Sequence, residues 1–180
     1  PKANRIGEEN NGWTYAKFLL GPERSSIAGV AKSKYRIAKL KQIARAEGSE
    51  GRRLIDDPAF ARKLAEAQMA LTALEYTDLR ELARAETSPG EVTPGPMPSL
   101  LKVKGSELQQ TLWELLVEAL GYYALPYDPV VIASGRNTPP LGPDYSHGVV
   151  EEHLHGRAAT IYGGSNEIQR NIMAKMVLDT

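Results

Sequence analysis

The sequence has no cysteine, which excludes disulfides, thiolate nucleophiles and cysteine-bound metals and suits a reducing compartment. It also lacks net charge, because 22 basic and 22 acidic residues cancel and no basic run occurs. A nucleic-acid or anionic-membrane partner therefore has no electrostatic support. No apolar run is long enough to span a bilayer, and the start lacks a charged-then-apolar signal segment. We expect a soluble, cytoplasmic chain with no nucleic-acid or membrane partner.

The apolar residues recur mainly at helical spacing along the sequence. The 180 residues, 42% of them hydrophobic, are enough for one globular domain, and no strand-like alternation persists. The pattern predicts an all-α fold, an antiparallel four-helix bundle with additional short helices over residues 12–180, preceded by a polar linker at 1–11. The stretches expected to be helical are 13–20, 22–48, 58–86, 100–121, 147–159 and 165–178, and proline-rich connectors are expected at 87–98 and 126–144.

The last of these helices follows a glycine turn. Gly163 and Gly164 permit backbone angles that a side chain would forbid, and Ser165 is a good N-cap. Such a turn aims free N–H groups at a ligand, but from spacing alone it is more often a plain turn and cap. Beyond it, a stripe of apolar residues at helical spacing predicts one buried face: Ile168, Ile172, Met173, Met176 and Val177.

The full string Ile161-Tyr-Gly-Gly-Ser-Asn-Glu-Ile-Gln-Arg-Asn-Ile172 is far more specific than its spacing. It strongly resembles the C-terminal signature of the acyl-CoA dehydrogenases, a family of FAD enzymes. The resemblance extends upstream through Gly7-Glu-Glu-Asn-Asn-Gly-Trp13, Pro22-Glu-Arg24 and Leu101-Lys-Val-Lys-Gly-Ser-Glu-Leu-Gln-Gln110. It therefore covers nearly the whole chain.

The resemblance implies a C-terminal helical domain whose parent protein has an N-terminal helical domain and a β-domain first. It also implies oxidation of an acyl-CoA thioester to the 2-enoyl-CoA with FAD, within fatty acid metabolism. The expected electron acceptor is an electron-transfer flavoprotein, and the expected assembly is a tetramer. Because the chain begins at Pro1 without methionine and resembles only the third part of the family's enzymes, we expect a fragment of a longer protein. Without the β-domain that covers the flavin in the family, the isolated fragment should be folded, colourless and inactive.

The same resemblance assigns the site residues. Most family members carry the catalytic base at the position of Gly163, which has no side chain here, whereas Glu23 stands where isovaleryl-type and long-chain members carry theirs. Glu23 is thus the candidate base, and the Gly163 N–H is a candidate donor to the thioester oxygen. Without the resemblance, Glu23 would be an ordinary first-turn acid. Ser165 and Glu167 take signature positions that contact FAD, although the Glu167 anion would repel a diphosphate unless a cation lies nearby.

Two departures concern the FAD of a neighbouring subunit. The family's Arg-x-x-Phe-Gly run is replaced by residues 48–57, in which Arg52 and Arg53 are candidate substitutes, and its Gln-x-x-Gly-Gly run by residues 118–122. These changes leave open a non-catalytic or half-catalytic subunit of a hetero-oligomer, and a plain helical oligomerisation module is a third reading. No metal site is expected, because His153 and His155 lie two positions apart and face away from one another on a helix.

Overall fold

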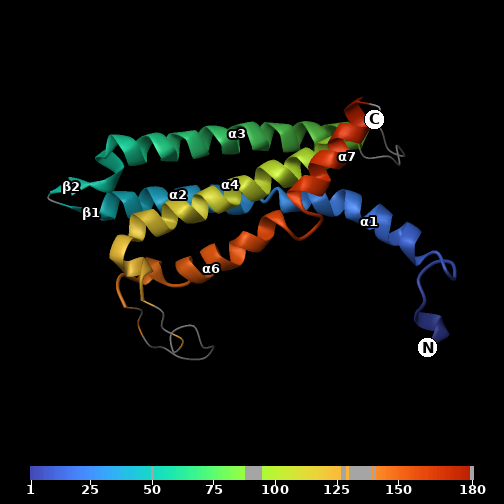
Figure 1. Cartoon of the computed structure of the whole chain (residues 1–180), viewed down its shortest axis with the longest axis horizontal. Helices are drawn as coiled ribbons and strands as arrows, with labels where there is room; N and C mark the ends of the chain where they lie inside the picture. The colour runs from blue at the N-terminus through green and yellow to red at the C-terminus, as the bar shows by residue number, and fades with distance from the viewer. Residues whose placement is uncertain (50, 88–94, 127–128, 130–138, 140, 179–180) are drawn as a thin grey trace.

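The computed structural model describes residues 1–49, 51–87, 95–126, 129, 139 and 141–178, which form a bundle of antiparallel helices (Figure 1). Helices α1 and α2 run toward a small hairpin, α3 returns, α4 runs back, and α6 and α7 return again. Both termini lie at the end opposite the hairpin. The predicted all-α bundle with additional short helices is confirmed. The described elements are α1 Gly12–Ile27, α2 Val30–Ala46, β1 Gly48–Ser49, β2 Arg52–Arg53, α3 Pro58–Thr87, α4 Met97–Leu120, α6 Val149–His155 and α7 Asn166–Leu178, with 3-10 turns at Lys2–Asn4, Leu54–Asp56 (η2), Gly121–Ala124 (η3), Asp144–Ser146 (η4) and Gly156–Thr160 (η5).

Helix α4 is the central element, since it packs against α1, α2, α3, α6 and α7. Its apolar stripe is buried as its periodicity predicts, and so is that of α3 over its first half. Both stripes enter one core together with residues of α2. The pattern's side chains that do lie in the core are Phe60, Leu64, Ala67, Leu71, Leu74, Leu108, Leu112, Leu115, Leu116, Ala119 and Leu120. Leu82, at the same spacing on α3, is instead 52% exposed.

The boundary between the first two helices differs from the prediction. Pro22 opens no helix: it lies inside α1, which continues to Ile27, and α2 begins at Val30. The break falls at Gly29, whose φ of 62° is left-handed. Ala28, fully buried, lies against Gly105 of α4, where an added Cβ would come 2.5 Å from the Ala28 Cα. The close approach of α4, rather than the proline, therefore decides where the chain bends.

The hairpin β1–β2 was not predicted. Its strands have two residues each and pair antiparallel, with Gly48 opposite Arg53. Strands this short cannot show the alternation by which a strand is recognised in sequence. The predicted helix at 147–159 divides into α6 and the tighter turn η5. The connectors expected at 87–98 and 126–144 fall largely outside the described residues.

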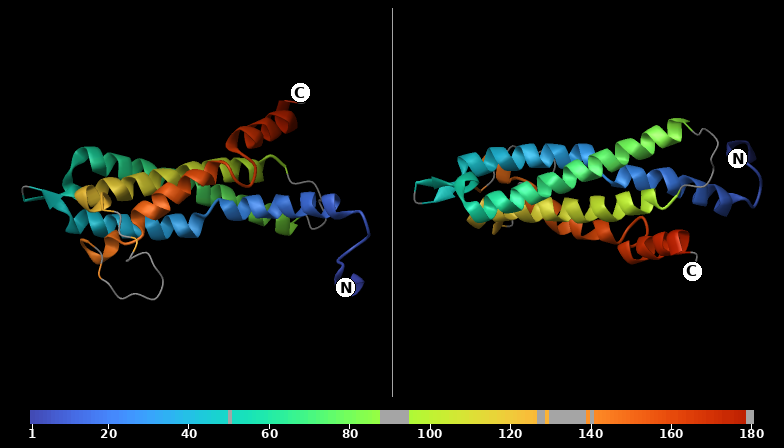
Figure 2. Two further views of the ribbon diagram at one scale, coloured as in Figure 1. Left: turned by 60° about the horizontal axis from the view of Figure 1, so that its bottom comes forward. Right: turned by 90° about the horizontal axis from the view of Figure 1, so that it is seen from above.

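The prediction that one face of α7 is buried is wrong. Of the five stripe residues, Ile168, Met176 and Val177 are 51%, 46% and 65% exposed, and Ile172 and Met173 are only half-buried. Figure 2 shows the reason: α7 leaves the bundle as it proceeds, so only its first turns contact α4. The buried residues of α7 are instead polar, Asn166 and Gln169. Among the described helices, none combines the length and apolarity required to cross a membrane.

Candidate functional site

The glycine turn before α7 has the backbone conformation that its sequence predicts. Gly163 and Gly164 have φ angles of 66° and 82°, both left-handed, and α7 begins directly after Ser165. An added Cβ on Gly164 would also lie 2.5 Å from the Gln169 Nε2. Among the described residues, no group accepts a hydrogen bond from the Gly163 N–H. The amide named as the candidate donor is therefore available to a ligand.

A buried polar network holds the first turn of α7 on α4. The Lys102 Nζ donates to the Asn166 Oδ1 at 2.8 Å, and the Ser106 hydroxyl lies 3.2 Å from the same oxygen. Lys102, Ser106 and Asn166 are all buried. Burial lowers the pKa of Lys102, and the charge of Glu167 partly offsets this effect. Sequence reasoning missed all three residues, because polar residues at buried positions look like surface residues when only periodicity is used.

Ser165 and Glu167 both lie at the N-terminus of α7. The Ser165 Oγ accepts a hydrogen bond from the Ile168 N–H at 3.4 Å, so it acts as the predicted N-cap. The pKa of the exposed Glu167 carboxyl is held below its ordinary value by its own backbone N–H, then by the Ser165 hydroxyl, with smaller contributions from Arg170 and Lys102. Two cations therefore lie near the Glu167 anion, as the sequence analysis required for a site beside a diphosphate.

The structure describes the backbone of Glu23 but not its side chain, which is outside the described residues. Because α1 runs unbroken to Ile27, Glu23 lies in the C-terminal half of that helix. The interpretation of Glu23 as a first-turn acid stabilised by the helix dipole is therefore wrong. The same α1 ends beside Gly105, while the glycine turn is held at Lys102 and Ser106. Both candidate catalytic elements thus meet one short stretch of α4.

The candidate substitutes for the missing cross-subunit arginine lie on the hairpin, at the far end of the bundle (Figure 1). The Arg53 guanidinium is paired with Asp56 in η2 through two bonds, at 2.8 and 3.2 Å. Arg52 is exposed, and after the hydrogen bonds from Arg53 its charge also contributes to lowering the pKa of Asp56. Residues 118–122 end α4 at the same end, so the two departures from the family pattern are neighbours in space.

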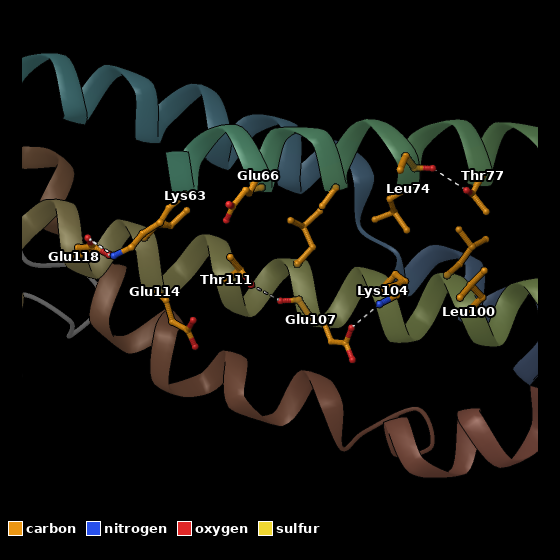
Figure 3. Close-up of a pocket in the computed structure, with 16 residues that line it drawn as sticks. Lys63, Glu66, Leu74, Thr77, Leu100, Lys104, Glu107, Thr111, Glu114 and Glu118 are labelled. Atoms are coloured by element: carbon orange, nitrogen blue, oxygen red, sulfur yellow. Dashed lines mark hydrogen bonds and ion pairs between the residues drawn. The ribbon is translucent and has the colours of Figure 1, made fainter. Parts of the chain in front are cut away.

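His153 and His155 lie on α6. In the described part of the chain, no three His, Cys, Asp or Glu side chains come close enough to hold a metal ion. A groove of about 740 Å³ lies elsewhere, between α3 and α4 (Figure 3). Alanines and leucines line its floor, and Lys63, Lys104 and Glu118 lie along it. Lys104 and Lys102 are two positions apart on α4 and project about 200° from one another, so the groove and the glycine turn occupy different faces.

A family model described as the acyl-CoA dehydrogenase C-terminal domain matches residues 10–178. The chain therefore belongs to the acyl-CoA dehydrogenase family and corresponds to its C-terminal helical domain. The resemblance stated from the signature is confirmed.

Among curated relatives, acyl-CoA dehydrogenase FadE26 of Mycobacterium tuberculosis is 30% identical over 99% of this chain. The match covers 42% of that relative, so this chain spans about two fifths of its length. Among solved structures, the ChsE4-ChsE5 complex from Mycobacterium tuberculosis matches with a TM-score of 0.74 and 29% identity, covering 100% of this chain and 44% of that one. Butyryl-CoA dehydrogenase from Megasphaera elsdenii has a TM-score of 0.74 at 18% identity, covering 99% and 42%, and supports the fold alone.

Proposed function

We propose that this chain is the C-terminal domain of a longer, FAD-dependent acyl-CoA dehydrogenase that converts an acyl-CoA thioester to the 2-enoyl-CoA. The observation that carries the proposal is the glycine turn at the start of α7, whose Gly163 N–H has no acceptor among the described residues, in a chain of this family. The bound flavin would supply the hydride acceptor. An electron-transfer flavoprotein would reoxidise it, and the cytoplasm is the proposed location.

The role of the Gly163 amide follows from the acidity of the substrate. Removing an α-proton from a thioester places negative charge on the carbonyl oxygen, and a carboxylate is a weak base toward such a carbon. A backbone N–H aimed at that oxygen stabilises the charge as it develops. Because the amide belongs to the backbone, Gly163 supplies it although it has no side chain to act as the base.

Glu23 is the proposed base. Ala28 in the α1–α2 junction contacts α4 at Gly105, and Asn166 at the end of the glycine turn contacts Lys102 and Ser106. These positions on α4 lie within about one helical turn of each other, which supports a base delivered from α1 to a substrate bound at the turn. Closure of the site would exclude water and strengthen the carboxylate as a base.

Ser165 and Glu167 are the proposed flavin contacts, and the residues present fit that group. The N-terminus of α7 offers N–H groups and a positive dipole end, and Lys102 and Arg170 lie near the Glu167 anion. An ionised carboxylate only accepts hydrogen bonds, so Glu167 suits a hydroxyl of the ribityl or ribose part better than the diphosphate.

The test is anaerobic bleaching of the flavin absorbance in the full-length protein across a panel of acyl-CoAs. Wild type should bleach, and Glu23→Gln should bind FAD but bleach at least about a thousandfold more slowly, since proton removal would lack its base. Glu86→Gln, on the exposed part of α3, is the matched control and should behave as wild type. Equal bleaching by Glu23→Gln would remove Glu23 from the mechanism.

A second candidate is a subunit that shares its flavin sites with a different acyl-CoA dehydrogenase chain. The similarity to the ChsE4-ChsE5 complex favours it, together with the absent carboxylate at Gly163 and the replaced runs near the hairpin. Co-expression with an acyl-CoA dehydrogenase gene that lies next to this one in the genome should then give a single complex of both chains. The FAD content per chain should be higher than for this chain expressed alone. A homotetramer with full FAD and full activity when expressed alone would contradict this candidate.

A further inference from the structure

Gln169 lies in α7, yet its side chain reaches back to the glycine turn. It is fully buried, and its Nε2 donates to the Gly163 carbonyl at 3.1 Å and to the Gly164 carbonyl at 3.4 Å. A buried amide group costs free energy where its hydrogen bonds are not made, and the Gln169 Oε1 is buried without a partner among the described residues. Both donor hydrogens of this amide are used on two consecutive carbonyls, so Gln169 forms a clamp on the turn.

The clamp determines the conformation of the turn. Gly163 and Gly164 both have positive φ, and two glycines in sequence have many alternative conformations. Two carbonyls can meet one NH2 group only if both point to the same side, which orients the adjoining peptide planes. No other hydrogen bond to these two carbonyls is found among the described residues. The side chain of Gln169 is thus the restraint that holds this conformation.

The base of the clamp is itself anchored. The Gln169 N–H donates to the Ser165 carbonyl at 2.9 Å within the first turn of α7. That turn is held on α4 by the bonds from Lys102 and Ser106 to Asn166. Displacement of the glycine turn would therefore require breaking either the clamp or a buried network. Space is restricted as well, because a Cβ at Gly164 would overlap the clamping Nε2.

We infer that Gln169 is a positioning residue: by clamping the Gly163 and Gly164 carbonyls it holds the Gly163 N–H in the orientation that receives the thioester oxygen. The inference rests on the proposed function, because it names the group that makes the proposed donor effective. Gln169 itself contacts neither substrate nor reacting atoms. Without the clamp the amide would still exist, but the turn would spend most of its time in orientations that do not stabilise the oxygen.

Gln110 provides a matched control. Its Nε2 donates to the carbonyls of Gly156 and Arg157, at 3.1 and 3.3 Å, and so clamps η5 by the same chemistry. No candidate reacting group lies in η5. Gln110→Met removes a clamp on two carbonyls of η5, and Gln169→Met removes a clamp on two carbonyls of the glycine turn. Only the glycine turn carries the candidate donor.

The experiment compares the two variants in the full-length protein. Hydrogen–deuterium exchange is followed over residues 160–168, and kcat and KM are measured on the acyl-CoA that wild type oxidises fastest. For Gln169→Met, loop exchange should rise and kcat fall by at least about tenfold, with KM within about threefold, because two net hydrogen bonds are lost and the donor acts mainly in the transition state. Gln110→Met should leave kcat and exchange at 162–166 within about threefold of wild type.

Other outcomes decide against the inference in distinguishable ways. If Gln169→Met exchanges like wild type, or its kcat falls no more than that of Gln110→Met, Gln169 is not a positioning residue. If wild type itself oxidises no acyl-CoA, the proposed function fails, and the assignment of the thioester oxygen fails with it. Should Gln169→Met not fold, Gly164→Ala disturbs the clamp from the other side and should show the same fall in kcat, with Gly148→Ala as control, since Gly148 has a similar positive φ and nothing near its Cβ position. An unchanged kcat in Gly164→Ala would overturn the inference.

Discussion

The two faces of α4 are covered in different ways. On one face, Lys102 and Ser106 reach the buried Asn166 directly after the glycine turn, so this contact is made by directional hydrogen bonds, and Gln110 bonds separately to η5. On the other face, α4 and α3 leave a groove of about 740 Å³ with alanines and leucines on its floor (Figure 3). The first surface is closed within this chain, and the second is open.

The two faces therefore differ in how strictly they determine the arrangement of the side chains that pack on them. Hydrogen bonds between buried groups have narrow distance and angle requirements, so the polar face permits one arrangement of the turn. Apolar contacts are non-directional and scale with area, so the groove defines no single arrangement. Substitutions should therefore be severe on the polar face and mild along the rim of the groove.

The largest effect is expected for Asn166→Leu. The buried Lys102 ammonium would lose its acceptor, and leaving a buried cation unpaired should lower the free energy of unfolding by about 3 kcal/mol. Urea denaturation of the 180-residue chain measures it. The double variant Lys102→Met with Asn166→Leu should recover to within about 1 kcal/mol of wild type. Additive losses in the double variant would show that the two side chains are not coupled.

A smaller loss is expected for Gly164→Ala. Alanine at a φ of 82° costs roughly 1 kcal/mol, and its Cβ would also displace the Gln169 Nε2, for a total of about 2 kcal/mol. Gly51 has a similar φ of 76° with nothing near its Cβ position, so Gly51→Ala isolates the conformational cost. Equal losses in the two variants, measured by urea denaturation, would mean that the clamp contributes nothing.

A weaker, pH-dependent effect is expected from Lys102. Burial lowers its pKa in the folded chain below the ordinary 10.5, so between the two values the unfolded chain binds more protons. Stability should then rise with pH through that window and reach its full gain near 10.5. The difference in unfolding free energy between wild type and Lys102→Met, followed from neutral pH upward, should increase in favour of wild type. A difference that stays constant with pH would contradict the lowered pKa.

The smallest effect is expected in the groove. Ala70 lines it and is exposed, so Ala70→Gln should change the free energy of unfolding by less than about 0.5 kcal/mol. Ala67, one turn earlier on α3, is 3% exposed, and Ala67→Gln should cost about 3 kcal/mol by overpacking the core and burying an amide. Thermal denaturation of the pair checks the contrast. Comparable losses at Ala67 and Ala70 would mean that the groove is not open.

Much of the fold could be predicted because long helices carry their burial pattern in their periodicity. Phe60, Leu64 and Leu112 were expected in the core and lie there. The predicted helix boundary was wrong where contact with another helix determines the position of the bend. Pro22 was expected to start a helix, but the chain bends at Gly29, against Gly105 of a helix some 75 residues away in the sequence.

For the site, the sequence alone is enough to predict the glycine turn, its Ser165 cap and, through the signature, membership of the acyl-CoA dehydrogenase family. These are local properties, since positive φ angles and N-caps depend on a few adjacent residues. Three features depend on the tertiary structure: Lys102 and Ser106 hold Asn166, Gln169 turns back on the two glycines, and most of the apolar side of α7 is exposed. These contacts join residues up to 64 positions apart, and a polar side chain gives no sign in sequence of whether its partner is water or a buried group.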